Sequence, residues 1–335
     1  MHFNVHFFYF IIILGSDYMI ESLNKIELHC HLDGSVRPQT VSEILGLPLE
    51  KVEREMCFKE SRKDLNEYLS KFDLPLSIMQ DKEGLIRVSR ELAEDMKKEH
   101  IIYAEVRYSP HKSTLKGLTL NEVVESTIIG FKQVQGIEIK IILCMMRDFD
   151  YDTNLEVIDL AEKYLGKGVC AIDLAGAEGL YKTETFEDLF LEARRRGIPF
   201  TIHAGEADGV DSIKSAIKFG TKRLGHGVRV LEDSNLLEYT CNNDILFEVC
   251  PTSNIQTGAS ISYKNHQLRT LFDEKCDVCI NTDNRTVSNT TLTKEIELMI
   301  ENQGFTIDDI RHMFKTALKH AFICEREYKE LIEKL

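Results

Sequence analysis

Short runs of apolar and β-branched residues recur along the chain, and stretches with apolar residues near helical spacing separate them. Eight such runs are typical of buried strands. They are KIELHCHL (25–32), IIYAEVRYS (101–109), IEIKIILCMM (137–146), VCAIDLA (169–175), PFTIHAG (199–205), RLGHGVRV (223–230), ILFEVCP (245–251) and DVCINTD (277–283). Because eight alternating strand and helix units close a barrel, we expect an α/β protein of the (β/α)8 TIM barrel class.

The intervening stretches predict amphipathic helices. The segments 120–134, 154–165, 186–197 and 210–220 carry apolar residues near helical spacing, and two of them end in glycine. The interval 40–99 is long for one connection, so we expect a helical insertion after the first strand. Segments 292–301 and 307–319 predict extra C-terminal helices. Since no repeat, low-complexity tract or linker interrupts the pattern, we expect one domain over residues 19–335.

The first residues differ from the rest of the chain. The stretch FNVHFFYFIIIL (3–14) is strongly apolar, but it is shorter than the roughly 20 residues that a membrane-spanning helix needs. No Lys or Arg precedes Lys25, whereas a secretory signal begins with a basic region. We interpret residues 1–18 as an apolar extension upstream of a translation start at Met19. The alternative is a genuine extension that packs on the body of the protein or on a partner.

Composition and charge narrow the possible partners. The chain has 41 Lys and Arg against 55 Asp and Glu, which gives a formal net charge of −14. An acidic chain without a basic stripe argues against a nucleic-acid partner. Nine cysteines without framework spacing predict reduced thiols in a cytoplasmic protein, and the CxxC pair Cys276 and Cys279 has no second pair beside it.

Polar side chains gather at the ends of the predicted strands, where barrel enzymes build their active sites. His29 and His31 are two residues apart on one strand, so their side chains share a face. His203 lies near the end of the fifth run, His226 lies in the sixth, and Asp283 ends the eighth. Taken singly, each of these residues has a structural explanation, such as packing or helix capping. Together, imidazoles and a carboxylate at strand ends predict a zinc site.

Two further groups have candidate roles. Glu206 follows His203 by three residues in HAGEADG, where it could face a substrate and donate a proton, although an exposed loop glutamate would look the same. The pair Glu105 and Arg107 in AEVRYSP is expected to serve packing and hydrogen bonding inside the barrel.

Seven motifs occur in the order ELHCHLDGS, AEVRYSP, DLAGAEG, TIHAGE, LGHGVRV, EVCPTSN and NTDN. In this order and at these intervals they resemble the metal-dependent adenosine deaminase family of the amidohydrolase superfamily. The resemblance extends from about residue 25 to the C-terminal helices. It implies a barrel with one zinc ion and hydrolytic removal of the 6-amino group of adenosine, which gives inosine and ammonia in purine salvage.

The resemblance also implies a role for each matching residue. The implied metal ligands are His29, His31, His203 and Asp283. Glu206 and His226 would act on substrate and water, and Glu206 would protonate ring nitrogen 1, which requires a raised pKa. The implied substrate contacts are His31, Asp33, Gly176 through its backbone, and Asn284.

One departure from the family pattern bears on specificity. Many family members carry two successive aspartates where this chain has Asp283 and Asn284. An asparagine amide can donate to ring nitrogen 7 without any pKa shift, so purine binding is expected to survive. Asp33 resembles the residue of the nucleoside enzymes, and a carboxylate near the sugar's 5′ position would repel a phosphate. This favours adenosine or 2′-deoxyadenosine over AMP.

Other functions remain open at this point. One is deamination of a related purine, such as adenine, methylthioadenosine or an N6-substituted adenosine. Another is a catalytically silent purine-binding protein, which would need a lost ligand or acid, although none of the six chemical positions is missing. Amidohydrolases with two metals usually carry a bridging lysine after the fourth strand, where this chain has DLAG. The expected partner is a small purine nucleoside, with no nucleic acid or membrane, and the oligomeric state stays undetermined.

Overall fold

The computed structural model describes residues 20–58 and 71–335. The apolar extension 1–18 and the start at Met19 lie outside these residues, so both interpretations stay predictions. Within the two described ranges, no helix has the length and apolar character that a membrane span requires.

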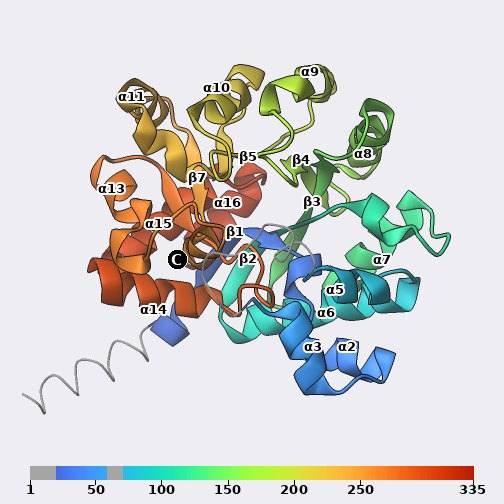
Figure 1. The fold of residues 1–335 in the computed structure, drawn as a ribbon. Coiled ribbons are helices and arrows are strands. Elements are labelled where there is room, and N and C mark those ends of the chain that lie inside the picture. Colours follow the sequence, from blue (N-terminus) through green and yellow to red (C-terminus); the bar gives the residue numbers. More distant parts are fainter. Residues whose placement is uncertain (1–19, 59–70) are drawn as a thin grey trace, which may run out of the picture.

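Eight parallel strands form the centre of the molecule (Figure 1). They are β1 (Lys25–His31), β2 (Ile101–Tyr108), β3 (Glu138–Met146), β4 (Val169–Ala175), β5 (Ile202–Ala204), β6 (Arg223–His226), β7 (Leu246–Val249) and β8 (Val278–Ile280). They pair in chain order as two four-stranded sheets, β1 to β4 and β5 to β8. Single bridges, Ile172 to Phe200 and Cys30 to Asp283, connect the two sheets. The expected (β/α)8 barrel is confirmed.

Some of the predicted strands extend beyond the ends of the observed strands. The sixth run was expected to continue through residue 230, but β6 stops at His226. The cause is local, because Gly227 adopts a left-handed conformation with φ of 69° and Val228–Glu232 then coils into a 3-10 helix. Val228 and Val230 of that turn are buried as strand residues would be, which explains why the composition of the run was misleading.

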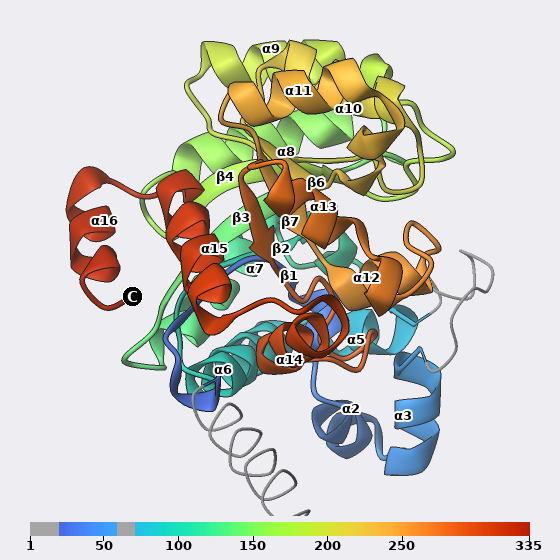
Figure 2. The same ribbon diagram turned by 90° about the vertical axis from the view of Figure 1, so that its left-hand side faces the viewer.

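Helices surround the strands on the outside (Figures 1 and 2). The insertion after β1 contains α2 (Pro38–Leu45), α3 (Leu49–Met56), α5 (Asp73–Ile78) and α6 (Lys82–Lys98), as predicted. The helices between later strands are α7 (Leu120–Lys132), α8 (Tyr151–Tyr164), α9 (Glu187–Arg195), α10 (Val210–Phe219), α11 (Ser234–Asn242), α12 (Pro251–Gln256) and α13 (Gln267–Asp273). The predicted C-terminal helices are α14 (Leu292–Gln303) and α15 (Ile307–His320), and α16 (Glu325–Ile332) follows them.

Residues at the helix ends explain where several helices begin and stop. Helix α7 begins at a capping box, in which the Thr119 side chain accepts from the Glu122 backbone and the Glu122 side chain accepts from the Thr119 backbone. Helix α10 ends at Gly220, whose φ of 99° is costly for any residue with a Cβ atom. These short-range signals support the helix boundaries that the hydrophobic pattern alone leaves loose.

An aromatic cluster packs α9 and α10 against the barrel. The ring of Phe190, which is fully buried, lies 4.9 Å from the ring of Phe200 and 5.5 Å from that of Phe219. Phe190→Ala is expected to lower the free energy of unfolding by about 3–5 kcal/mol, because it leaves a cavity among these rings. Urea unfolding measures the loss. The neighbouring Leu191→Ala is the control, since Leu191 is exposed, and equal losses in both variants would contradict the prediction.

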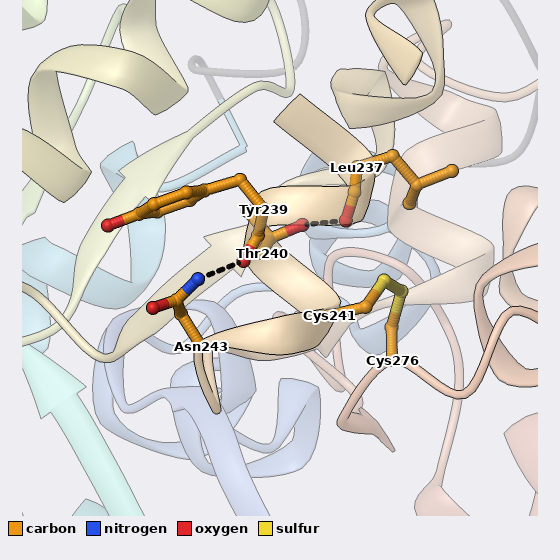
Figure 3. Close-up of a disulfide and its surroundings, with 6 residues drawn as sticks. All are labelled: Leu237, Tyr239, Thr240, Cys241, Asn243 and Cys276. Carbon is orange, nitrogen blue, oxygen red and sulfur yellow. Dashed lines mark hydrogen bonds between the residues drawn. A yellow bond between two sulfur atoms is a disulfide. The ribbon is translucent and has the colours of Figure 1, made fainter. Parts of the chain in front are cut away.

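The prediction that all nine cysteines are reduced is wrong for one pair. Cys241 near the end of α11 forms a disulfide with Cys276, which precedes β8, and their Cα atoms are 4.3 Å apart (Figure 3). Helix α11 leads into β7 and Cys276 leads into β8, and these two strands are neighbours. The two segments therefore enter the barrel side by side, although 35 residues separate them and no spacing pattern marks the pair. The cysteines within the strands are buried, and their thiols are free, as the prediction of reduced thiols requires.

Candidate active site

Four predicted metal ligands converge at the carboxyl ends of three strands. His29 and His31 come from β1, His203 from β5, and Asp283 lies three residues beyond β8. One donor atom from each lies within 4.8 Å of the others. His31 Nε2 is 3.3 Å from His203 Nε2 and 3.4 Å from Asp283 Oδ1, while His29 Nε2 is 3.6 Å from the same oxygen. Residues that are 254 positions apart in the chain thus share one small site.

The backbone around this cluster has unusual features. Gly225 of β6 leaves room for the imidazoles, because a Cβ atom there would lie 3.0 Å from His29 Cε1 and 3.1 Å from His203 Cα. Asp283 and His226 both have positive φ angles, 58° and 62°. Non-glycine residues seldom adopt this conformation, and such strain is concentrated at functional sites. Strand pairing holds Asp283 in place, since its backbone exchanges hydrogen bonds with His29 and His31.

Carboxylates on the far side of the cluster orient two of the imidazoles. Glu248 Oε2 lies 2.9 Å from His29 Nδ1, and Asp173 Oδ2 lies 2.8 Å from His203 Nδ1. Arg107 lies between the two carboxylates and donates to both, at 2.7 Å and 2.8 Å. Glu248 engages His29 Nδ1, and His29 Nε2, on the cluster side of the ring, is buried without a hydrogen-bond partner in the described part of the chain. This orphaned nitrogen fits a metal ligand whose orientation is set by an outer carboxylate.

The roles of these supporting carboxylates are not predicted from the sequence. The predicted hydrogen bonding of Glu105 and Arg107 inside the barrel is confirmed, whereas Asp173, Glu248 and Ser253 have no predicted role. The Ser253 hydroxyl donates to Asp283 Oδ2 at 2.5 Å. A signal for Asp173 and Glu248 was present, since each is a carboxylate within an otherwise apolar strand. A charge buried in such a strand requires a partner inside the barrel.

Glu206 and His226 lie beside the cluster. Glu206 Oε2 is 3.5 Å from His226 Nε2, and Glu206 Oε1 accepts a hydrogen bond from Thr257 Oγ1 at 2.9 Å. Burial, together with the charge of Asp283, raises the pKa of Glu206 to about 7, so much of this carboxyl is protonated at neutral pH. Burial lowers the pKa of His226 to about 4, so this imidazole is neutral. The Asn254 amide lies 3.0 Å from His226 Nδ1 and holds the ring in place.

The predicted substrate contacts lie on the same rim. Asp33 follows β1, its Oδ1 is shielded from solvent without a hydrogen-bond partner among the described residues, and burial raises its pKa to about 6. Asn284 packs over Gly34, where a Cβ atom would lie 1.8 Å from the Asn284 amide oxygen. Gly176 follows β4 with φ of 102° and lies beside Met146 at the end of β3. The structure therefore places all of the predicted site residues at one end of the barrel.

The fold and this donor set define a metal-dependent barrel hydrolase. The family profile described as adenosine deaminase matches residues 24–335. An adenosine deaminase of Clostridium kluyveri is 37% identical over 328 residues, which cover 94% of each chain. The chain belongs to the adenosine deaminase family.

Solved structures extend the comparison. The N6-methyl-AMP deaminase of Arabidopsis thaliana superposes with a TM-score of 0.84 at 26% identity, covering 94% of this chain and 96% of that one. An amidohydrolase of Burkholderia ambifaria with bound zinc has the same TM-score at 21% identity, covering 94% of this chain and 90% of that one. At that identity the second likeness concerns the fold alone.

Proposed function

We propose that this protein is a zinc-dependent adenosine deaminase, which hydrolyses adenosine and 2′-deoxyadenosine to inosine and deoxyinosine with release of ammonia, in purine salvage. The observation that carries the proposal is the position of Glu206, a largely buried carboxyl with a raised pKa beside four side chains that could hold a metal ion. Family membership and the curated relatives support the same reaction. We propose further that residues 19–335 form one catalytic domain. The cytoplasmic location stays a prediction.

The metal ligands proposed are His29, His31, His203 and Asp283. Three imidazoles and one carboxylate fit a single zinc ion, and burial lowers the pKa of His31, which keeps that ring available as a neutral ligand. A zinc ion bound there supplies a Lewis acid that makes water a nucleophile at neutral pH. In this proposal, the four ligands set only the position of the ion.

The chain's own residues supply the remaining chemistry. Glu206 in its protonated form donates to ring nitrogen 1 of the purine, so that the ring can accept the electrons released by attack at carbon 6. The neutral His226 orients the attacking water and stabilises the developing oxyanion. Asp33 accepts from a sugar hydroxyl, the Gly176 backbone contacts the purine, and the Asn284 amide donates to ring nitrogen 7. His31 also borders the bound nucleoside.

The test is an ultraviolet absorbance assay of zinc-loaded protein with adenosine, deoxyadenosine, adenine, AMP and N6-methyl-AMP in parallel. We expect rapid turnover of the two nucleosides and little turnover of the nucleotides, because the Asp33 carboxylate opposes a phosphate. Preferred turnover of AMP or N6-methyl-AMP would contradict the assignment of Asp33. No turnover with zinc bound would favour a silent purine-binding protein.

The outer carboxylates offer a prediction on metal affinity. Asp173→Asn is expected to weaken zinc binding by about 10–100-fold, because the amide no longer stabilises the correct tautomer of His203. Competition with a chromophoric chelator measures the dissociation constant. Asp188→Asn is the control, since Asp188 lies in the first turn of α9 outside the site. Unchanged zinc affinity in Asp173→Asn would show that the contact with His203 does not matter.

A further inference from the structure

Glu178 is a buried carboxylate in the connection after β4, and none of the roles above involves it. It is 3% exposed, and five donors converge on its two oxygens. Oε1 accepts from the backbone N–H of Gly205 at 2.6 Å and from the Ser212 hydroxyl. Oε2 accepts from the next three backbone N–H groups, those of Glu206, Ala207 and Asp208, at 3.0, 2.7 and 3.0 Å.

These four consecutive N–H groups belong to the loop between β5 and α10, which carries Glu206. A loop offers such groups no helical or strand partners, so a buried loop needs another acceptor. One carboxylate accepts all four of them. Hydrogen bonds to a charged acceptor are roughly twice as strong as neutral ones, which makes this contact a firm anchor.

A second set of contacts connects the same anchor to the strand that carries His203. Arg147 donates to the His203 carbonyl at 2.6 Å and to Thr183 Oγ1 at 3.0 Å. The Thr183 and Ser212 hydroxyls are 2.7 Å apart, and Ser212 donates to Glu178. The end of β5 and the loop after it are therefore held in one buried network between a guanidinium and a carboxylate.

We propose that Glu178 is a positioning residue for Glu206, which sets the place and direction of the Glu206 carboxyl by gathering the backbone of residues 205–208. The inference rests on the proposed function, in which Glu206 is the proton donor. Glu178 contacts the backbone of the loop and not the substrate. Its negative charge has an additional effect, because it helps burial and Asp283 to raise the pKa of Glu206.

The test compares Glu178→Gln with Glu184→Gln. The first variant keeps the shape of the side chain, but its amide nitrogen cannot accept from N–H groups. Glu184 is exposed in the same connection and serves as the control. We expect Glu178→Gln to lower kcat by about 10²-fold, the cost of a catalytic group displaced by about 1 Å, with a smaller change in KM. We also expect the alkaline limb of the pH profile of kcat/KM to move to lower pH, while zinc affinity stays at the parent value.

A purely structural role would lower thermal stability without moving the pH limb. A kcat within twofold of the parent and an unmoved limb would overturn the inference. If Glu178→Gln does not fold, Glu178→Asp keeps the charge but draws the carboxylate back by one methylene. That variant is expected to lose kcat with an unmoved limb, and parent-like kcat in it would equally overturn the inference.

Glu206→Gln, assayed in parallel, separates this inference from the proposed function. Parent-like activity in Glu206→Gln would remove Glu206 as the proton donor, whatever Glu178→Gln does. An inactive Glu206→Gln together with a parent-like Glu178→Gln would refute the positioning role alone.

Discussion

Glu206→Gln is expected to lower kcat for adenosine by about 10²–10⁴-fold, the usual contribution of a general acid. Glutamine keeps the size of the side chain and its hydrogen bond with Thr257, but it has no acidic proton for the purine ring. Zinc binding should not change, since Glu206 is not among the proposed ligands. Steady-state kinetics with zinc-loaded protein measures the loss.

The proposed role of Glu206 also predicts the direction in which kcat/KM changes with pH. Because the acid form of Glu206 is the active one and its pKa is about 7, kcat/KM is expected to fall as the pH rises through about 7. The variant should lack this alkaline limb. Glu232→Gln is the control, since Glu232 is an exposed carboxyl on the same rim. Activity of Glu206→Gln within tenfold of the parent would rule out Glu206 as the acid.

Asp283→Asn is expected to weaken zinc binding at least 100-fold and to abolish deamination at zinc concentrations that saturate the parent. Loss of an outer partner alone typically costs about 10–100-fold in metal affinity, and this variant loses a charged ligand. Asparagine also tolerates the positive φ of 58° at this position, so the backbone is expected to stay in place. Chelator competition and activity titrated with zinc are the two measurements.

A matched variant lies at the opposite end of β8. Asp277 precedes β8 and pairs with Lys319 and His320, away from the four metal-type donors. Asp277→Asn should bind zinc like the parent. Parent-like zinc affinity in Asp283→Asn would remove this residue from the ligand set.

Much of the fold followed from the hydrophobic pattern, since strands that are buried on both faces leave apolar runs in any sequence. The exact ends of the strands could not be predicted from the hydrophobic pattern. In the sixth run, Gly227 turns the chain while Val228 and Val230 stay buried, so composition continued after the strand had ended. The disulfide was also beyond reach, because Cys241 and Cys276 meet only through the pairing of β7 with β8.

In the candidate site, too, some residues could be predicted from the sequence and others could not. His29 and His31 could be placed together from their spacing, and His203, Glu206 and Asp283 from their positions at strand ends. The role of Glu178 could not be predicted, because four of its five partners are backbone N–H groups 27 to 30 residues away, and backbone groups carry no signature in the sequence. Groups that act through side chains at predictable strand ends are visible in a sequence, whereas groups that support a loop backbone become visible only in the fold.

The separation of the four metal-type donors along the chain also bears on biosynthesis. His29 and His31 lie in the first of the two four-stranded sheets, His203 in the second, and Asp283 beyond the last strand. During synthesis from the N-terminus, the ribosome has to release more than four-fifths of the chain before the fourth donor can reach the other three. The four-donor cluster can thus assemble only in a nearly finished polypeptide, and products truncated before residue 283 lack its carboxylate.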